Sequence, residues 1–145
     1  MEGALVGGNA VRILIVDGDA EARDTLAVLL RRPGRTVQCF ENLPEAVRSI
    51  LHEEAHVLVL DCGQSGLPCE TALSLLRELA PGLPVLLTTT DPEGYEAARW
   101  TRAGVFRVVG KPFHPAELHE AVDRARTFWA AGPPPTATPT SQPAL

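Results

Sequence analysis

Short apolar runs alternate strictly with amphipathic segments along most of this chain, and this alternation constrains the fold more than any other feature. The runs lie at residues 11–16, 36–40, 56–60, 84–88 and 105–109, and each is short enough for a strand buried on both faces. Segments with helical periodicity follow them at residues 20–32, 43–51, 71–79, 93–102 and 115–129. Buried strands that alternate with helices predict a doubly wound α/β fold, with a five-stranded parallel sheet and five helices.

Capping residues and apolar periodicity support the helices in this pattern. Asp19 is a suitable N-cap for the first helix, and Asn42 with Glu45 resembles a capping box that opens the second. The apolar face of each helix predicts the side chains that point inward, and this set includes Leu51, Leu79 and Trp129.

The two ends of the chain differ in composition from the middle. Residues 1–10 are rich in glycine and are predicted to be disordered. Residues 130–145 contain five prolines and no charge, which predicts an extended linker or tail. A single folded domain is therefore expected over residues 11–129.

Charge and cysteine content limit the partners and the compartment. The formal net charge is −5 and the basic residues are scattered, which argues against direct binding of nucleic acid. No apolar stretch is long enough to cross a membrane, and the first residues do not resemble a secretory signal, so we expect a cytoplasmic protein. Cys39, Cys62 and Cys69 lack metal-ligand spacing and are expected to be reduced thiols.

Charged or hydroxyl residues stand at or within two residues of the ends of four of the five apolar runs. Asp17 follows the first run, Asp61 the third, Thr89 the fourth, and Lys111 stands two residues beyond the fifth. In a doubly wound sheet these residues gather beyond the carboxyl ends of the strands. Carboxylates gathered there repel each other unless Mg²⁺ or an ammonium group lies between them. A carboxylate in that setting can attack a phosphoryl group, and the hydroxyl can donate a hydrogen bond to its oxygens.

The order and spacing of these residues resemble the CheY-like receiver domains of bacterial response regulators. The segments ILIVD, VLVLD, LAPGLPVLLTT and VGKPFHPAEL carry the resemblance. Asp61, Thr89 and Lys111 follow Asp17 at successive intervals of 44, 28 and 22 residues. The resemblance implies a flavodoxin-like fold and a signalling switch rather than an enzyme. It also implies a sensor histidine kinase or phosphotransfer protein as donor, and an output domain or protein partner bound through the fourth helix and fifth strand.

The resemblance assigns a role to each residue of the constellation. Asp61 matches the phosphoacceptor, Thr89 the switch hydroxyl and Lys111 the lysine that pairs with the phosphorylated site. Asp17 matches the first of two acids that support Mg²⁺, and Gly63 matches the position whose backbone carbonyl completes the metal coordination. The step from Lys111 to the following proline stands where family members often have a cis peptide bond.

Three features depart from the family pattern, and one is the loop after Asp61, where Ser65 stands for the usual proline and Cys69 for a later glycine. Gly18 replaces the second acid, which is usually a direct metal ligand, and Asp19 stands one residue later. Asp19 is expected to cap the first helix, with metal binding as the alternative. The usual aromatic residue on the last strand is Val108. Loss of one carboxylate predicts that Mg²⁺ binds weakly.

Two other functions compete with phosphate acceptance. Gly18 and Val108 favour a degenerate receiver that binds a partner without phosphorylation. Asp17 and Asp19 after an apolar strand also resemble haloacid-dehalogenase-type phosphatases. Those enzymes need an acidic pair after the lysine and a cap after the first strand, and this chain shows neither.

Overall fold

The computed structural model describes residues 10–131, except the side chains of residues 129–131. Nearly all of the predicted disordered segment at residues 1–10 and most of the predicted tail therefore lie outside the described residues, as does the Trp129 side chain. The last helix ends at Ala131, so it includes the first two residues of that predicted tail.

Five parallel strands form one sheet in the order β2-β1-β3-β4-β5. Their bounds are β1 (Val11–Val16), β2 (Arg35–Phe40), β3 (Val57–Asp61), β4 (Val85–Thr89) and β5 (Arg107–Gly110). The first strand, β1, lies inside the sheet. The second strand, β2, forms one edge beside it, and β3, β4 and β5 follow in order on the other side of β1. The predicted doubly wound parallel sheet is confirmed, and its switch point lies between β1 and β3.

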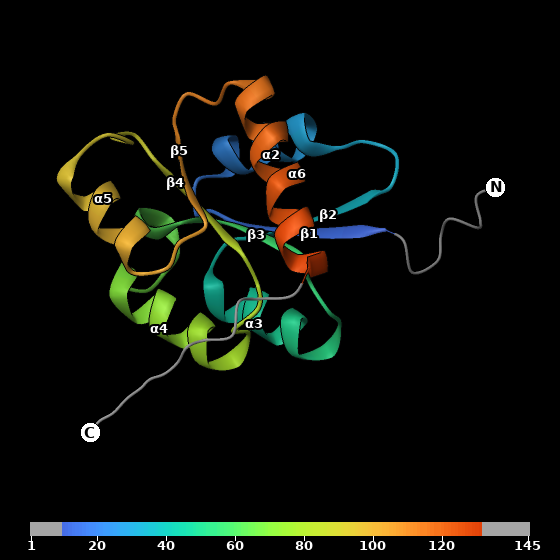
Figure 1. Cartoon of the computed structure of the whole chain (residues 1–145), viewed down its shortest axis with the longest axis horizontal. Coiled ribbons are helices and arrows are strands. Elements are labelled where there is room, and N and C mark those ends of the chain that lie inside the picture. Colours follow the sequence, from blue (N-terminus) through green and yellow to red (C-terminus); the bar gives the residue numbers. More distant parts are fainter. Residues whose placement is uncertain (1–9, 132–145) are drawn as a thin grey trace.

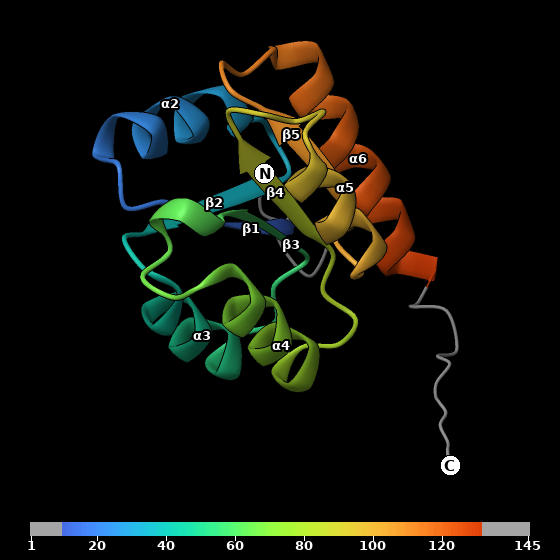
Figure 2. The ribbon, with the colours of Figure 1, turned by 90° about the vertical axis from the view of Figure 1, so that its left-hand side faces the viewer.

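Five helices cover the two faces of the sheet (Figures 1 and 2). Residues of α2 and α6 pack on one face, and residues of α3, α4 and α5 pack on the other. The helices are α2 (Ala20–Leu30), α3 (Leu43–His52), α4 (Cys69–Leu79), α5 (Tyr95–Arg102) and α6 (Pro115–Ala131), with a short 3₁₀ helix η1 (Cys62–Gln64) after β3. Within residues 10–131, no helix is both long enough and apolar enough to cross a membrane.

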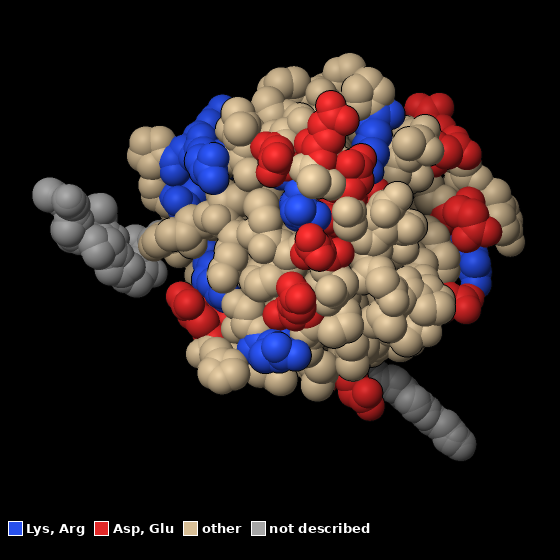
Figure 3. Space-filling view, turned by 180° about the vertical axis from the view of Figure 1, so that it is seen from behind, with Lys and Arg blue, Asp and Glu red and all other residues tan. Residues whose placement is uncertain are grey.

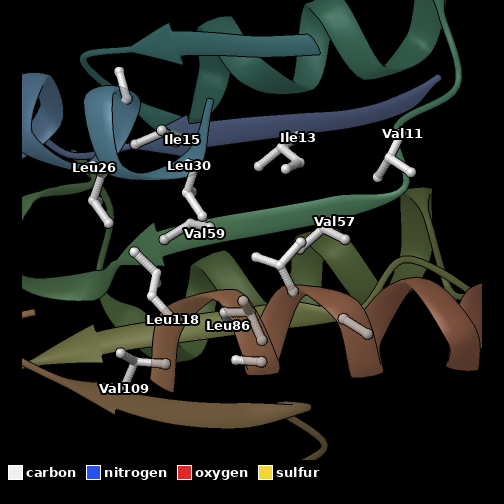
Figure 4. Packing of buried hydrophobic residues seen from close by; sticks show 14 residues of the cluster. Val11, Ile13, Ile15, Leu26, Leu30, Val57, Val59, Leu86, Val109 and Leu118 are labelled. Atoms are coloured by element: carbon white, nitrogen blue, oxygen red, sulfur yellow. The ribbon is translucent and has the colours of Figure 1, made fainter. Parts of the chain in front are cut away.

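Alternate residues of the central strands enter two separate hydrophobic clusters. Ile13 and Ile15 of β1 join the cluster under α2 and α6, which Figure 4 shows from close by. Leu14 and Val16 join the cluster on the opposite face. Successive side chains of a strand point to opposite faces, so a strand covered on both sides must be apolar throughout. This requirement explains the continuous apolar runs in the sequence.

Arg12 is the charged exception within β1, and only 6% of it is exposed. Its guanidinium donates hydrogen bonds to the carbonyl of Glu53 at 2.7 Å and to Oε1 of Gln38 at 2.9 Å. These bonds satisfy the buried charge at the amino end of the strand. Arg12 therefore anchors the edge of the sheet opposite the carboxyl ends.

Two predicted inward positions were wrong, and the start of α4, the start of α5, the start of β5 and the end of α2 each differ from the prediction by two residues. Leu51 is 63% exposed and Leu79 is 41% exposed. Leu51 lies in the last turn of α3 and Leu79 is the final residue of α4, where the helices have less of the sheet to contact. The first helix ends at Leu30 rather than residue 32 because the backbone is already extended at Arg31. The side chain of Arg35 donates to the Leu30 carbonyl at 3.0 Å and caps this end.

Candidate functional site

The carboxyl ends of β1, β3 and β5 bring Asp17, Asp61 and Lys111 together. The Lys111 ammonium donates a hydrogen bond to Oδ2 of Asp17 at 3.1 Å and another to Oδ2 of Asp61. Asp17 is fully buried, and Asp61 is 8% exposed. The ammonium of Lys111 lies between the two carboxylates and compensates their negative charge in this buried setting.

The Lys111 ammonium is held in its charged form by these neighbours. Burial alone lowers the pKa of Lys111, but the hydrogen bonds and the negative charges of Asp61 and Asp17 outweigh it and raise the pKa above its ordinary value. Lys111 follows β5, and its backbone N–H donates to the Thr89 carbonyl at 2.8 Å. Its peptide bond to Pro112 is cis. The position of the ammonium is thus set from two adjacent strands.

The loop after β3 supplies backbone groups to the Asp61 carboxylate. The N–H of Gly63 donates to Oδ1 of Asp61 at 2.8 Å, so this carboxylate caps η1. One residue further, the carbonyl of Gln64 accepts a hydrogen bond from the N–H of Gly18 at 2.6 Å. The loops that follow β1 and β3 are therefore joined directly to each other.

Asp19 lies beside this cluster, but its carboxylate serves the helix. Its Oδ1 accepts a hydrogen bond from the N–H of Glu21 at 3.1 Å, which confirms the predicted N-cap of α2. Its own N–H donates to Oδ1 of Asp17 at 2.9 Å. The Asp19 side chain is exposed, whereas that of Asp17 is enclosed. Lys111 is hydrogen-bonded to Asp17 and Asp61 and not to Asp19, although Asp19 lines the same cavity as Asp61 and Lys111.

Thr89 and its neighbour Thr88 end β4 in different environments. The Thr89 hydroxyl is half-buried and accepts a hydrogen bond from the N–H of Asp91 at 3.1 Å. Thr88 is paired with Asp61 across the sheet and is only 3% exposed. Its hydroxyl oxygen has no hydrogen-bond partner among the described residues. The sequence does not reveal this buried hydroxyl, because three threonines stand in a row at residues 88–90 and residue type does not show which one points inward.

A cavity of about 520 Å³ extends from Asp61 and Lys111 toward α5. The end of β4 and residues Ala97 and Trp100 of α5 line its other side. Val108 and Trp100 both pack against the second hydrophobic cluster. The site thus opens into a space between β4 and α5 that is large enough for a phosphoryl group.

The prediction of three reduced cysteines was wrong. Cys62 and Cys69 form a disulfide, and Cys39 is a free, exposed thiol. The loop between the pair turns at Gly66, where φ is +89°, and this brings the two Cα atoms to 4.9 Å. Sequence spacing alone could not give this distance, because it depends on the path of the loop.

The oxygen groups at the site suit a hard cation better than a transition metal. Asp17 and Asp61 can offer carboxylate oxygens, and Gly63 can offer its backbone carbonyl. No group of three or more His, Cys, Asp or Glu side chains suited to a metal ion occurs within the described part of the chain. Mg²⁺ keeps several of its own waters when it binds a protein, so it needs only a small number of protein oxygen ligands.

These features define a class of protein: a doubly wound α/β domain with buried carboxylates and a lysine at the switch point of its sheet. The response regulator receiver domain matches residues 13–123 of this chain. The chain therefore belongs to the response regulator receiver family, and the resemblance seen in the sequence is confirmed.

Related proteins and structures agree with this assignment. The chain is 26% identical over 117 residues to the DNA-binding transcriptional regulator NtrC of Proteus hauseri, covering 81% of this chain and 25% of that protein. It is 29% identical over 118 residues to the transcriptional regulatory protein GltR of Pseudomonas aeruginosa, covering 78% of this chain and 48% of that protein. The chain thus spans about a quarter to a half of the length of these relatives.

Solved structures match the fold. The beryllofluoride-activated NtrC4 receiver domain dimer matches with a TM-score of 0.74 and 21% identity, covering 81% of this chain and 98% of that one. The chemotaxis response regulator CheY4 of Vibrio cholerae matches with a TM-score of 0.71 and 19% identity, covering 80% of this chain and 98% of that one.

Proposed function

We propose that this domain accepts a phosphoryl group on Asp61 from a histidine kinase or a phosphotransfer protein, with assistance from Mg²⁺. The observation that carries the proposal is the Lys111 ammonium, which is hydrogen-bonded to both Asp17 and Asp61 beside an open cavity. Membership of the receiver family supports the same assignment. The domain acts as a switch in two-component signalling and not as an enzyme.

The residues divide the chemistry between them. A carboxylate oxygen of Asp61 attacks phosphorus, and the bond from phosphorus to the donor nitrogen breaks as the acyl phosphate forms. Lys111 balances the negative charge that gathers on the phosphoryl oxygens. Asp17, Asp61 and the Gly63 carbonyl would hold Mg²⁺, which supplies further positive charge beside the phosphoryl group.

Thr89 links acceptance of the phosphoryl group to a change in the loop that follows β4. Its hydroxyl now accepts from the N–H of Asp91. A turn of the side chain toward a phosphoryl group on Asp61 would break this bond and release the start of the loop. The loop leads into α5, so we propose that the change passes to the start of α5, and that an output domain or a protein partner binds at the surface of α5 and β5.

The surface charge fits a protein partner better than a nucleic acid. Acidic side chains are scattered over the face shown in Figure 3, with basic side chains among them and at its edge, and uncharged residues cover most of that face. A phosphate backbone on that face would meet carboxylates as well as cations. Direct binding of nucleic acid is therefore not part of the proposal, and a cytoplasmic location stays a prediction from the sequence.

Labelling with a small phosphodonor tests the proposal. Acetyl phosphate with Mg²⁺ should add the mass of one phosphoryl group to the whole chain, and Asp61→Asn should abolish this gain. Peptide mapping should place the group on Asp61. A label on Asp17 or Asp19 would contradict the assignment, as would labelling that is unchanged when Mg²⁺ is removed with a chelator.

A degenerate receiver is the second candidate, and the Asp19 cap favours it. Oδ1 of Asp19, the only other acid in the loop after β1, caps α2, and Gly18 offers no carboxylate. A domain of this kind would bind its partner without being phosphorylated, so its affinity for the partner would not be switched. Absence of Mg²⁺ binding at millimolar concentration, together with no phosphorylation, would support this alternative.

A further inference from the structure

The disulfide between Cys62 and Cys69 closes the loop that borders the phosphorylation site. We propose that this disulfide is a reversible redox modification site, and that its oxidised form binds Mg²⁺ more tightly than its reduced form. The inference rests on the proposed function, because it concerns the same Mg²⁺ and phosphoryl site.

The bond encloses the backbone groups that serve the site. Cys62 is joined by peptide bonds to Asp61 and to Gly63, and Cys69 is the first residue of α4. Within the ring, the N–H of Gly63 holds the Asp61 carboxylate at 2.8 Å. The Gln64 carbonyl, also within the ring, holds the loop after β1 through its bond with Gly18. A change in the conformational freedom of this ring therefore changes how firmly the Asp61 carboxylate is held.

The fold itself does not depend on the disulfide. Both cysteines lie at the margin of the second hydrophobic cluster rather than among its buried members. Ser65 anchors the middle of the loop independently: its hydroxyl donates to the Leu67 carbonyl at 3.0 Å, and its carbonyl accepts from Leu43 at 2.8 Å. Reduction should therefore leave the domain folded and loosen the segment that carries Gly63 and Gln64.

The disulfide lies in a partly exposed loop, which small thiols and disulfides can approach. Both cysteines are half-buried, and the neighbouring Gly63, Gln64 and Gly66 are exposed. A low-molecular-weight disulfide can oxidise the pair in two steps. One protein thiolate attacks it, forming a mixed disulfide and releasing one small thiol. The second protein thiol then displaces the other small thiol, so two protein thiols are oxidised and one small disulfide is reduced. A small dithiol reverses the reaction.

The oxidised form should bind Mg²⁺ more tightly because the disulfide orders the loop between Cys62 and Cys69 before the cation binds. A closed ring has already lost freedom that an open loop must lose when its carbonyl binds a cation. Loop closure for a ring of this size limits the gain to roughly 60-fold. Ser65 keeps part of the loop ordered in either form, so we expect Mg²⁺ affinity to be about tenfold higher in the oxidised form.

Calorimetric titration of Mg²⁺ into the oxidised and reduced chain tests the proposal. After treatment with oxidised glutathione, peptide mapping should show Cys62 joined to Cys69, and intact mass should show Cys39 either free or carrying one glutathione. After dithiothreitol, alkylation should show all three thiols free. Cys69→Ser and Cys62→Ser should each bind Mg²⁺ like the reduced form and lose the redox response. Cys39→Ser is the matched control, and it should respond like the parent chain.

The outcomes separate this proposal from the function on which it rests. Equal Mg²⁺ affinity in both forms, tighter binding in the reduced form, or three free thiols after oxidation would each overturn it. Phosphorylation by acetyl phosphate is measured in parallel. If neither form is phosphorylated but their Mg²⁺ affinities differ as expected, the phosphoacceptor assignment fails and the redox proposal survives.

Discussion

Replacing Thr88 with valine should make the domain more stable, although it removes a polar group next to the site. Thr88 is 3% exposed, and its hydroxyl has no hydrogen-bond partner among the described residues. Valine places a methyl group where the hydroxyl stood and keeps a β-branched side chain in β4. A buried hydroxyl without a partner costs about 1–3 kcal/mol of stability. We therefore expect Thr88→Val to raise the free energy of unfolding by about 1–2 kcal/mol.

Thr89→Val provides a control of opposite sign on the adjacent residue. The Thr89 hydroxyl accepts from the N–H of Asp91, which is exposed and can bond to water after the substitution. Loss of this hydrogen bond should lower the free energy of unfolding by about 0.5–1 kcal/mol. The two variants make the same chemical change, so a difference in sign isolates the environment of the hydroxyl.

Urea unfolding followed by circular dichroism measures both effects. All samples are kept fully oxidised so that the disulfide contributes equally. The midpoint should move to higher urea for Thr88→Val and to lower urea for Thr89→Val, with the same dependence of free energy on urea. A loss of stability in Thr88→Val above about 0.5 kcal/mol would refute the reasoning, because it would mean that the hydroxyl has a partner in solution.

Three further predictions address the site. Gly18→Asp should bind Mg²⁺ more tightly than Gly18→Ala in a titration, because only the aspartate adds a carboxylate ligand. The alanine variant is the control for the new Cβ, which would lie 3.0 Å from the backbone oxygen of Gln64 in either variant. If the two variants bind Mg²⁺ equally, another group already supplies the missing ligand. The pKa of Lys111 is higher in the folded state than its ordinary value of 10.5. Its ion pairs therefore contribute fully to stability when the pH is below 10.5, and this contribution is lost as the pH rises through the folded pKa. Chemical unfolding between pH 9 and 12 should show this loss, and Lys111→Met should remove it. The measurement uses a Cys39→Ser background, because partial desolvation raises the pKa of that largely exposed thiol. Amide exchange with and without beryllofluoride should change at residues 89–94 and the start of α5, because Val108 is too short to move into space that the Thr89 side chain vacates. Changes of equal size across β5 would show that this strand takes part in the switch.

The order of strands and helices could be predicted because covering both faces of a parallel sheet imposes a pattern on every strand. The convergence of Asp17, Asp61 and Lys111 followed from the same reasoning, since the carboxyl ends of parallel strands share one edge. Local capping chemistry was also sufficient to place Asp19 and Asn42, and both caps are confirmed.

The remaining features depend on backbone paths and side-chain rotations that residue types do not determine. The Cys62–Cys69 bond requires a loop that doubles back, and the contact between Gly18 and Gln64 requires two loops to meet. The exposure of Leu51 depends on where a helix leaves the sheet, which apolar periodicity does not report.

Lys111 is the only lysine in the printed sequence, and the other twelve of its thirteen lysine and arginine residues are arginines. A chain grown with isotopically labelled lysine would therefore carry its label at a single residue, in the middle of the proposed acceptor site. One resonance from its side chain would report directly on the ammonium that contacts Asp17 and Asp61. Metal binding, phosphorylation and reduction of the neighbouring disulfide could then be followed in one sample, without assignment of any other signal.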